Sequence, residues 1–415
     1  MKKTLRDICI KNKKVLLRVD YNVPLDKHLE VLDDERIIRT VPTIQYILRQ
    51  GASIILMSHL GRPKGHFIPS MSLYPVAKYL SKILNIDVKF FGNDCISNET
   101  KQGVSQLQPG EICLLENLRF HCEEEGKNSL GEKDTSAMYK FAQQLATMGT
   151  VFVQDAFGVL HREHASTVGI VRYISNAVVG FLVENELKCL SKVITNPLHP
   201  FLLILGGAKV TDKIKVIHNL VNKVSHIALG GAMAYTFLFS QGIQMGHSIV
   251  DNDQLQLAKD LLRNEQHKLF ILPIDHVIIS KNNFIDGKIT DNCQFIITKD
   301  NMIYDKFMLG VDIGPRTVNL FTKFINLAKT IVWNGPLGVF ESNQFSKGTT
   351  AIAKAIAQAT RNGAFSIIGG GDSVAAVKQA NVNKDISHIS TGGGASLAFL
   401  SGTKLPGLQV LPNII

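Results

Sequence analysis

Apolar runs of strand length alternate with helix-like patterns along most of this 415-residue chain. Strands that alternate with helices form parallel sheets through right-handed crossovers, so the pattern predicts an α/β fold. Apolar runs such as FLLIL and FSII fit sheets covered by helices on both faces. The strand-like stretches cover residues 14–23, 52–60, 111–120, 150–159, 201–207, 226–231, 269–279, 330–338, 365–373 and 388–396.

Helical patterns separate these stretches, for example at residues 72–85, 136–149 and 184–194. A further helical pattern covers residues 33–51, where Asp33 is a plausible N-cap and Gly51 follows the last turn. Pro42 lies inside this pattern and either kinks the helix or divides it in two.

The length of the chain exceeds what one hydrophobic core usually supports, so we expect two domains. The boundary is predicted near residues 180–195, where the helix at 184–194 would bridge two lobes. Each lobe is expected to be a Rossmann-like parallel sheet flanked by helices.

Composition is that of an ordinary globular enzyme, with 45% hydrophobic and 19% charged residues. The charged start MKKTLRDICIKNKK lacks the apolar core of a signal peptide, and no apolar run approaches the length of a membrane span. The six cysteines form no C-x-x-C pair, which is typical of buried thiols in a reducing compartment. We therefore expect a cytoplasmic protein without a membrane partner.

A net charge of +10 favours acidic partners, either nucleic acid or small phosphorylated metabolites. The lysines are scattered, and no basic stripe is interleaved with aromatic residues, so nucleic acid is disfavoured. Solvated surface lysines are an alternative explanation for much of this charge.

Five strand ends in the second half carry glycine turns: LGGAK, LGGAM, WNGPLG, IGGGDS and STGGGAS. Glycine lets the backbone approach a ligand, and a helix that starts just afterwards adds amide groups for an anion. One such turn is usually structural, but five at one end of a sheet indicate a polyphosphate ligand. The Walker phosphate loop and the G-x-G-x-x-G fingerprint are both absent from the sequence.

Two lysines and one aspartate follow these turns. Lys209 and Lys213 would occupy the opening turns of a helix, where two cations are unfavourable unless an anion binds there. Asp372 follows three glycines, where a carboxylate is compatible with phosphate if Mg²⁺ lies between them. Asp372 and Ser373 are also ordinary capping residues, and the two roles are compatible.

Arginine is concentrated in the first half, with nine residues at or before position 172 and three after it. Arg36, Arg62, Arg119 and Arg162 fall in loops or at strand ends, where their guanidinium groups suit a small acid bearing phosphate and carboxylate. Phosphoryl transfer fits two such anion sites, because it requires positioning and charge neutralisation rather than a protein nucleophile.

Taken in order, the motifs RVDYNVP, SHLGRP, ENLRF, DAFG with HREHAS, LGGAKVTDKI, WNGPLGVFE, GGGDS and STGGGASLAFL resemble those of phosphoglycerate kinases. The resemblance spans residues 15 to about 408. It implies reversible phosphoryl transfer from 1,3-bisphosphoglycerate to MgADP, giving 3-phosphoglycerate and MgATP, in line and after hinge closure. It also implies a monomer with an N-terminal phosphoglycerate domain at 1–180, an interdomain helix at 181–195, a nucleotide domain at 196–395, and a tail at 396–415 that returns to the first domain.

The matching motifs imply the following ligand contacts. The acid substrate would be held by Asp20, Tyr21, Asn22, Arg36, His59, Leu60, Gly61, Arg62, Arg119 and Arg162. The nucleotide would be held by Gly207, Ala208, Lys209, Lys213, Gly310, Asn334, Pro336, Gly338, Val339, Glu341, Gly370, Gly371, Asp372 and Ser373. Asp372 would bind the nucleotide's Mg²⁺, and the transferred group would be stabilised by Arg36, Lys209, Lys213, Gly370 and Gly393.

The chain departs from the family pattern at a few positions. Ala232 stands where a third glycine is common, and its methyl group would narrow the adenine pocket. Ala398 and Ser401 replace two usual glutamates near the tail, and Tyr21 replaces a usual phenylalanine. Two other classes of protein are alternatives: a nicotinamide-dependent oxidoreductase, which the missing G-x-G-x-x-G opposes, and a nucleic-acid-binding protein, which leaves the glycine turns unexplained.

Overall fold

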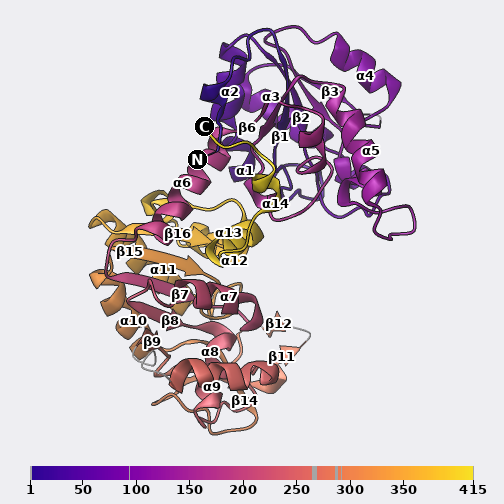
Figure 1. Cartoon of the computed structure of the whole chain (residues 1–415). Helices are drawn as coiled ribbons and strands as arrows, with labels where there is room; N and C mark the ends of the chain where they lie inside the picture. The colour runs from indigo at the N-terminus through magenta and orange to yellow at the C-terminus, as the bar shows by residue number, and fades with distance from the viewer. Residues whose placement is uncertain (1, 93, 264–268, 286–287, 291, 415) are drawn as a thin grey trace. The chain divides into compact units, whose positions relative to one another are not determined.

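The computed structural model describes residues 2–92, 94–263, 269–285, 288–290 and 292–414. The chain forms two compact units, and the division between them falls inside helix α6 (Phe181–Thr195). Unit 1 runs to Lys188 and includes the chain again from Lys404, whereas unit 2 spans Cys189–Thr403. In each unit helices flank a six-stranded parallel sheet, as predicted from the alternating pattern (Figure 1).

The sheet of unit 1 has the strand order β3-β4-β2-β1-β5-β6, and every neighbouring pair is parallel. Its strands are β1 (Lys14–Arg18), β2 (Ser53–Met57), β3 (Val88–Phe91), β4 (Ile112–Leu115), β5 (Val151–Gln154) and β6 (Ala177–Val179). Its helices are α1 (Glu35–Ile38), α2 (Val41–Arg49), α3 (Tyr74–Leu84), α4 (Asn98–Ser105), α5 (Thr135–Ala146) and the start of α6. The central strands β1 and β2 are buried on both faces, which explains the apolar runs VLL and IILM within them.

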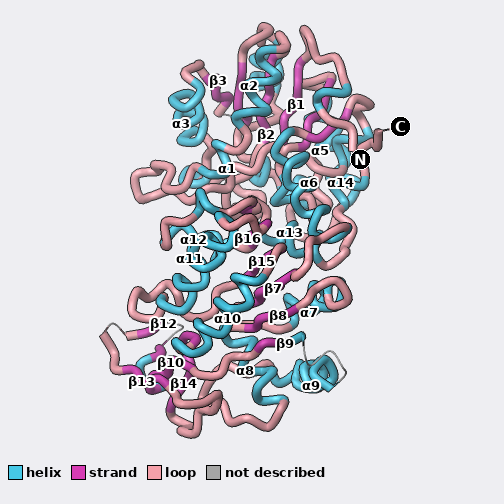
Figure 2. The backbone as a smooth tube through the Cα atoms, turned by 90° about the vertical axis from the view of Figure 1, so that its left-hand side faces the viewer, coloured by secondary structure: helices cyan, strands magenta, loops and turns pink. Residues whose placement is uncertain are grey.

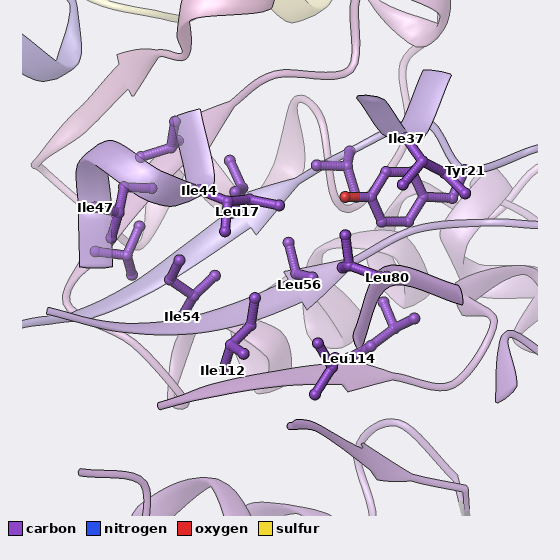
Figure 3. Close-up of a cluster of buried hydrophobic side chains, with 14 of the residues drawn as sticks. Leu17, Tyr21, Ile37, Ile44, Ile47, Ile54, Leu56, Leu80, Ile112 and Leu114 are labelled. Atoms are coloured by element: carbon purple, nitrogen blue, oxygen red, sulfur yellow. The ribbon is translucent and has the colours of Figure 1, made fainter. Parts of the chain in front are cut away.

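The core of unit 1 lies between the sheet and the helices (Figure 3). Leu17 of β1 and Ile54 of β2 are fully buried and belong to one cluster with Ile44 and Ile47 of α2. Leu80 of α3 joins the same cluster. Truncating one such side chain to alanine would cost about 2–5 kcal/mol of stability, so this core fixes the strand ends that carry the site.

Pro42 divides the helical pattern predicted over 33–51 into α1 and α2. Proline is compatible with the first turn of a helix but not with its interior, so a new helix starts there. The N-cap of α1 is Asp34 rather than Asp33, although Asp33 Oδ1 accepts a hydrogen bond from the amide of Glu35. Gly51 has a left-handed φ of +73°, which fits its place after the end of α2.

The sheet of unit 2 has the order β17-β16-β15-β7-β8-β9, again entirely parallel. Its strands are β7 (Phe201–Leu205), β8 (His226–Leu229), β9 (Phe270–Ile271), β15 (Thr330–Asn334), β16 (Phe365–Gly369) and β17 (His388–Ile389). Its helices are the end of α6, α7 (Thr211–Leu220), α8 (Gly231–Ser240), α9 (Leu255–Arg263), α10 (Pro315–Leu327), α11 (Lys347–Arg361), α12 (Gly371–Gln379) and α13 (Gly393–Leu400). Trp333 and Phe321 are fully buried in its core.

The prediction of one strand over residues 269–279 is wrong. This stretch forms β9, which joins the parallel sheet, and β10 (His276–Ser280), which belongs to a separate antiparallel sheet. Pro273 lies between the two strands and prevents one continuous strand, because proline lacks the amide hydrogen that pairing in a sheet needs.

The sequence pattern also missed the antiparallel sheet itself, in which β10 lies between β13 (Phe295–Ile297) and β14 (Met308–Ile313) (Figure 2). A two-stranded ribbon of β11 (Phe284–Ile285) and β12 (Lys288–Ile289) lies in the same stretch of chain. Apart from 269–279, the predicted strands all end earlier than expected; for example, the stretches 111–120 and 150–159 continue after β4 and β5 as the short 3₁₀ turns η3 (Leu118–Phe120) and η5 (Phe157–Val159).

The end of the chain packs on unit 1. The amide of Gly407, in the short helix α14 (Pro406–Gln409), donates to the carbonyl of Leu160 at 3.0 Å. The Lys2 ammonium donates to the carbonyl of Leu411. Among the described residues, no helix is both long enough and apolar enough to cross a membrane.

Candidate active site

The loops that follow β1 and β2 hold the first group of predicted site residues. Asp20 Oδ1 accepts hydrogen bonds from the Asn22 amide at 3.3 Å and from Arg36 Nη1 at 3.1 Å. Arg36 Nη1 also donates to the Asn22 carbonyl at 3.0 Å. Asn22 Oδ1 in turn accepts from the Gly61 amide at 2.8 Å. Residues from two neighbouring strand ends are thereby joined into one hydrogen-bonded group, with the Arg36 side chain one-third exposed.

The turn η3 after β4 brings a second guanidinium to the same group. Arg119 Nη1 donates to the carbonyl of Gly61 at 2.9 Å, and Arg119 Nε forms an ion pair with Glu125 Oε1 at 3.2 Å. Asn117 caps η3 by accepting from the Arg119 amide, and its side chain also bonds both backbone groups of Leu60. Asn117 therefore fixes the backbone of Arg119, and the Gly61 carbonyl with Glu125 holds its guanidinium in place.

A buried network lies beneath these residues, and the sequence pattern did not reveal it. Arg18 Nε donates to Ser166 Oγ at 2.7 Å, and Arg18 forms an ion pair of 3.7 Å with Glu124. Glu124 Oε1 accepts from the Ser166 hydroxyl at 2.6 Å. Arg18 and Glu124 are both completely buried, so each needs the other's charge. The sequence did not predict this pairing, because a single arginine in the apolar run VLLRV does not indicate which residue it contacts.

The two buried histidines of this region stay neutral. Burial, together with the charge of Arg18, holds the pKa of His59 well below its usual range. Burial and the charges of Arg119 and Arg18 lower the pKa of His164 to about 2. Arg18 Nη2 lies 3.3 Å from His59 Nδ1, which leaves the Nε2 hydrogen of His59 to face Asp20 Oδ1 at 3.8 Å. The positive charge of this site therefore comes from arginines rather than histidines.

The remaining predicted residues of unit 1 differ in exposure. Arg62 is exposed, and the partly buried Arg162 donates from Nε to His161 Nε2 at 3.2 Å. The Tyr21 side chain is fully buried in the core (Figure 3). Its hydroxyl forms a hydrogen bond with Thr40 Oγ1 at 2.8 Å. Only the backbone of Tyr21 is left for a ligand contact, since an aromatic ring on this strand end belongs to the core.

In unit 2 the five predicted glycine turns follow five adjacent strands of one sheet, β17, β16, β15, β7 and β8. The sheet is parallel, so these turns lie along a single edge. Glycine is required at several of them by close backbone approach. A Cβ atom on Gly206 would lie 2.0 Å from the Pro336 carbonyl oxygen, and one on Gly335 would lie 2.2 Å from the Gly206 oxygen.

A pocket of about 840 Å³ opens at this edge. That volume lies in the range of small-molecule sites. Eight predicted nucleotide residues are among its lining residues: Gly207, Ala208, Gly310, Pro336, Gly338, Val339, Glu341 and Asp372. The structure therefore brings together residues that are up to 165 positions apart in the sequence, from Gly207 to Asp372.

A second cluster of predicted residues forms around Asn334 at the end of β15. Lys213 Nζ donates to Asn334 Oδ1, and a Cβ atom on Gly370 would lie 3.1 Å from Asn334 Nδ2. A Cβ atom on Gly393 would lie 3.6 Å from the Gly371 amide nitrogen, so the first turns of α12 and α13 lie side by side. Asn334 Nδ2 is buried and has no hydrogen-bond partner within the described part of the chain. A buried donor beside two helix N-termini is suited to an anion.

Two details differ from expectation or refine it. Helix α7 begins at Thr211 with Val210 as its N-cap, so only Lys213 lies in its first turn. Lys209 precedes the helix and is exposed, so the prediction that both lysines occupy the opening turns of the helix is wrong for Lys209. Ser373 is buried, and its hydroxyl accepts from the Gly335 amide at 2.6 Å, which ties α12 to the glycine turn after β15.

The pocket also contains residues that sequence reasoning missed: Gly231, Tyr235, His247, Ile249, Phe284, Lys288, Ile289, Leu309, Val311 and Ser342. Tyr235 is only 5% exposed, and a Cβ atom on Gly310 would lie 2.0 Å from its hydroxyl oxygen. Tyr235 lies three residues after Ala232, so both reach the pocket from one face of α8. That i, i+3 spacing in GGAMAY was the available signal.

Apart from Tyr21, the departures from the family pattern lie in two helices, Ala232 in α8 and Ala398 with the C-cap residue Ser401 in α13. Ala232 lines the pocket, as its predicted effect on a base would require. Ser401 Oγ donates to the carbonyl of Ala398 at 2.8 Å and lies 2.9 Å from Thr403 Oγ1. The two residues that replace the usual glutamates thus serve the end of α13 itself.

The comparison with known proteins is consistent along the whole chain. A family model described as phosphoglycerate kinase matches residues 5–403. A phosphoglycerate kinase of Chlorobium phaeobacteroides (strain BS1) is 48% identical over 410 residues, covering 99% of each chain, and one of Koribacter versatilis is 49% identical over 420 residues, again covering 99% of each. Among solved structures, phosphoglycerate kinase from Coxiella burnetii is 35% identical with a TM-score of 0.83, covering 99% of this chain and 98% of the other. The enzyme from Pyrococcus horikoshii has the same TM-score and coverage at 30% identity.

Proposed function

The chain belongs to the phosphoglycerate kinase family, and we propose that unit 1 binds the phosphoglycerate while unit 2 binds the magnesium nucleotide. The protein is a phosphotransferase of glycolysis and gluconeogenesis that acts on a carboxyl acceptor. The reactants are 1,3-bisphosphoglycerate with ADP in one direction, and 3-phosphoglycerate with ATP in the other.

The assignment of the acid to unit 1 rests on the guanidinium groups at its strand ends. Arg36 and Arg119 are both held by hydrogen bonds to the loop after β1 and β2. Arginine forks recognise carboxylate and phosphate oxygens in pairs, so fixed arginines select for geometry as well as charge. Arg36 would face the carboxyl end, and Arg62 and Arg162 would contact the phosphate-bearing part. Asp20 and Asn22 supply oxygen atoms for the substrate hydroxyl.

The assignment of the nucleotide to unit 2 rests on one observation above all: five adjacent strands end in glycine turns, and residues of four of these turns line a single pocket. Apolar side chains such as Val339 and Leu309 line this pocket and would pack against the base. Glu341 would accept hydrogen bonds from ribose hydroxyls. Tyr235 and Ala232 would contact the base edge and so influence the choice between ATP and GTP.

Asp372 suits the magnesium ion of the nucleotide. Its exposed carboxylate lines the pocket from the first turn of α12, and Mg²⁺ commonly takes one or two carboxylates together with phosphate oxygens. The ion would supply charge neutralisation for the phosphates. The chain's own part is to hold the carboxylate at that place.

The chemical step requires no protein nucleophile. A carboxylate oxygen of 3-phosphoglycerate attacks the γ-phosphorus of ATP, and the bond to the β–γ bridging oxygen breaks, so that ADP leaves. Lys213 would follow the transferred group, and the amides of Gly370 and Gly393 would stabilise its equatorial oxygens. Lys209 would neutralise charge on the remaining phosphates. A closure of the two units about α6 would bring the reactants into line and exclude water.

A coupled assay tests this function directly. Purified protein should consume ATP only when 3-phosphoglycerate and Mg²⁺ are both present. The reaction is measured as NADH oxidation by a coupling dehydrogenase that reduces the product, 1,3-bisphosphoglycerate. ATP and GTP are compared side by side. Consumption of ATP without 3-phosphoglycerate, or equal turnover after EDTA treatment, would contradict the proposal.

A further inference from the structure

A mixed group of metal-binding side chains lies in unit 1, in neither of the sites described above. Asp94, Cys95 and His121 each offer one ligand atom, and these three atoms lie within 4.8 Å of one another. Asp94 and Cys95 belong to the loop that joins β3 to α4, and His121 follows η3. An oxygen, a sulfur and a nitrogen ligand therefore converge from two separate segments of the chain.

The imidazole of His121 is oriented as in many metal sites. Its Nε2 lies 2.9 Å from Asp94 Oδ1, and its Nδ1 lies 3.8 Å from Glu123 Oε2. The ring stacks on Phe141, with centroids 4.8 Å apart. A carboxylate behind the far nitrogen of a ligating histidine fixes its tautomer and strengthens its bond to a metal.

The other two side chains are also held in place. The Ile96 amide donates to Asp94 Oδ1 at 2.9 Å, and the Asp94 carbonyl accepts from Thr100 Oγ1 at 2.8 Å. Cys95 is 1% exposed, whereas half of the Asp94 side chain is exposed. The ligands thus range from a buried sulfur to an open carboxylate, which leaves an approach from solvent.

We propose that Asp94, Cys95 and His121 bind a single zinc ion, with water as the fourth ligand. Zn²⁺ accepts sulfur, imidazole nitrogen and carboxylate oxygen together in a tetrahedral arrangement, whereas Mg²⁺ and Ca²⁺ prefer oxygen alone. On binding, the Cys95 thiol loses its proton to solvent as the sulfur–zinc bond forms. The ring proton of His121 moves from Nε2 to Nδ1, facing Glu123, and its hydrogen bond to Asp94 is replaced by two bonds to the ion.

The location gives the ion a structural consequence. His121 is two residues after Arg119 and three residues before Glu124, which holds Arg18. Zinc would therefore link the loop after β3 to the segment that carries these charged residues. It would stabilise the native state, because it would bind the native state and not the unfolded chain.

Cobalt provides the test, because a thiolate bound to Co²⁺ gives a charge-transfer absorption in the near ultraviolet. Untagged full-length protein is treated with EDTA, exchanged into metal-free buffer and titrated with Co²⁺. We expect one equivalent to saturate the absorption, and Zn²⁺ to abolish it by displacement. Cys95→Ser should remove the absorption, and Asp94→Asn, at the exposed ligand, should weaken Co²⁺ binding at least tenfold.

Two matched variants identify the sulfur. Cys9→Ser changes an exposed thiol, and Cys122→Ser changes the thiol next to His121; both should leave the absorption unchanged. Thermal unfolding provides a second readout, in which Zn²⁺ raises the midpoint of the wild type but not of Asp94→Asn. If the wild type shows no thiolate absorption, or if Cys95→Ser retains it, the group is an ordinary histidine–aspartate hydrogen bond beside a buried thiol and the proposal is wrong.

Discussion

The two six-stranded parallel sheets present different chemistry at their carboxyl ends. In unit 1 the strand ends carry charged side chains, and Asp20, Arg36 and Arg119 are joined by hydrogen bonds through Asn22 and Gly61. In unit 2 the strand ends carry glycine turns. Their backbones approach one another so closely, as at Gly206 and Pro336, that there is no room for a side chain. We propose that the same type of sheet prepares an anion site with guanidinium groups in unit 1 and with backbone amides in unit 2.

The difference fits the ligand that we propose for each unit. A small acid with a carboxylate and a phosphate is recognised by forks at fixed separations, so unit 1 needs a rigid support for its arginines, supplied by Asn117 and by the buried Arg18–Glu124 pair. A polyphosphate with its metal presents many equivalent oxygens, so unit 2 needs many donors at close range. We therefore expect the loss of a charged side chain, or a change of pH, to affect unit 1 most. Unit 2 should be affected most by side-chain atoms added at its glycine turns and by the loss of its lysines.

The largest expected effect is on turnover, at Lys213. Replacing Lys213 by alanine should lower kcat about 100- to 1,000-fold, because it removes a cation that acts on charge developing in the transition state. The KM for 3-phosphoglycerate should change little, since that substrate is assigned to unit 1. Lys215→Ala, at an exposed position on the same helix, is the control and should keep kcat within about twofold. Full turnover by Lys213→Ala would remove this residue from the mechanism.

A smaller effect, confined to the acid substrate, is expected at Arg62. The Arg62→Ala variant should raise the KM for 3-phosphoglycerate about 10- to 100-fold, since a hydrogen bond to a charged group contributes about 1.5–3 kcal/mol. The KM for ATP should stay the same. Arg49→Ala removes another guanidinium from unit 1, on α2, and should change neither constant. A rise in the ATP constant alone would reverse the assignment of the two units.

The pH dependence of stability tests the buried support of unit 1. The pKa of His164 is about 2 in the folded protein, against about 6.5 in an unfolded chain. Below pH 6.5 the unfolded state takes up a proton that the native state refuses, so stability falls as the pH falls, by up to about 1.4 kcal/mol per pH unit for this residue. Urea unfolding between pH 7 and pH 5 should therefore show a shallower slope for His164→Gln than for the wild type. An exposed residue, His28, provides the control His28→Gln, whose slope should match the wild type.

The smallest expected effect concerns the base. Removing the hydroxyl in Tyr235→Phe should change the KM for ATP or the ATP-to-GTP preference by about 2- to 10-fold, the value of one hydrogen bond. Tyr304→Phe is a matched control at an exposed tyrosine of unit 2. If both variants retain the wild-type constants for both nucleotides, Tyr235 only fills space beside Gly310.

Much of this arrangement could be predicted from the sequence, because hydrophobic periodicity is local. The runs at FLLIL and TIVWN became central strands β7 and β15, and the glycine turns after them reached one pocket. The antiparallel sheet of β10, β13 and β14 was missed because β13 is an exposed strand of three residues, and because periodicity does not say which strands pair. The strand predicted over 269–279 failed at Pro273 for the same reason: periodicity does not say which sheet a strand joins.

The site residues follow the same division. Residues that stand inside a motif, such as Asn22 or Asp372, could be proposed from the sequence alone. Partners that have no motif were not: Arg18 pairs with Glu124 over 106 positions, and Tyr235 reaches Gly310 only after α8 packs beside β14. The exposed position of Lys209 before α7 also could not be predicted, because helix starts are the least certain feature of a pattern.

Amide hydrogen exchange with each ligand alone tests the division of labour between the two units most directly. With MgADP, we predict protection at the glycine turns of unit 2, residues 206–213, 230–235, 334–341 and 369–373, and little change at the strand ends of unit 1. With 3-phosphoglycerate, protection should instead appear at residues 19–23, 59–62, 117–121 and 161–166. Protection by MgADP at the arginine loops, or by 3-phosphoglycerate at the glycine turns, would contradict the account.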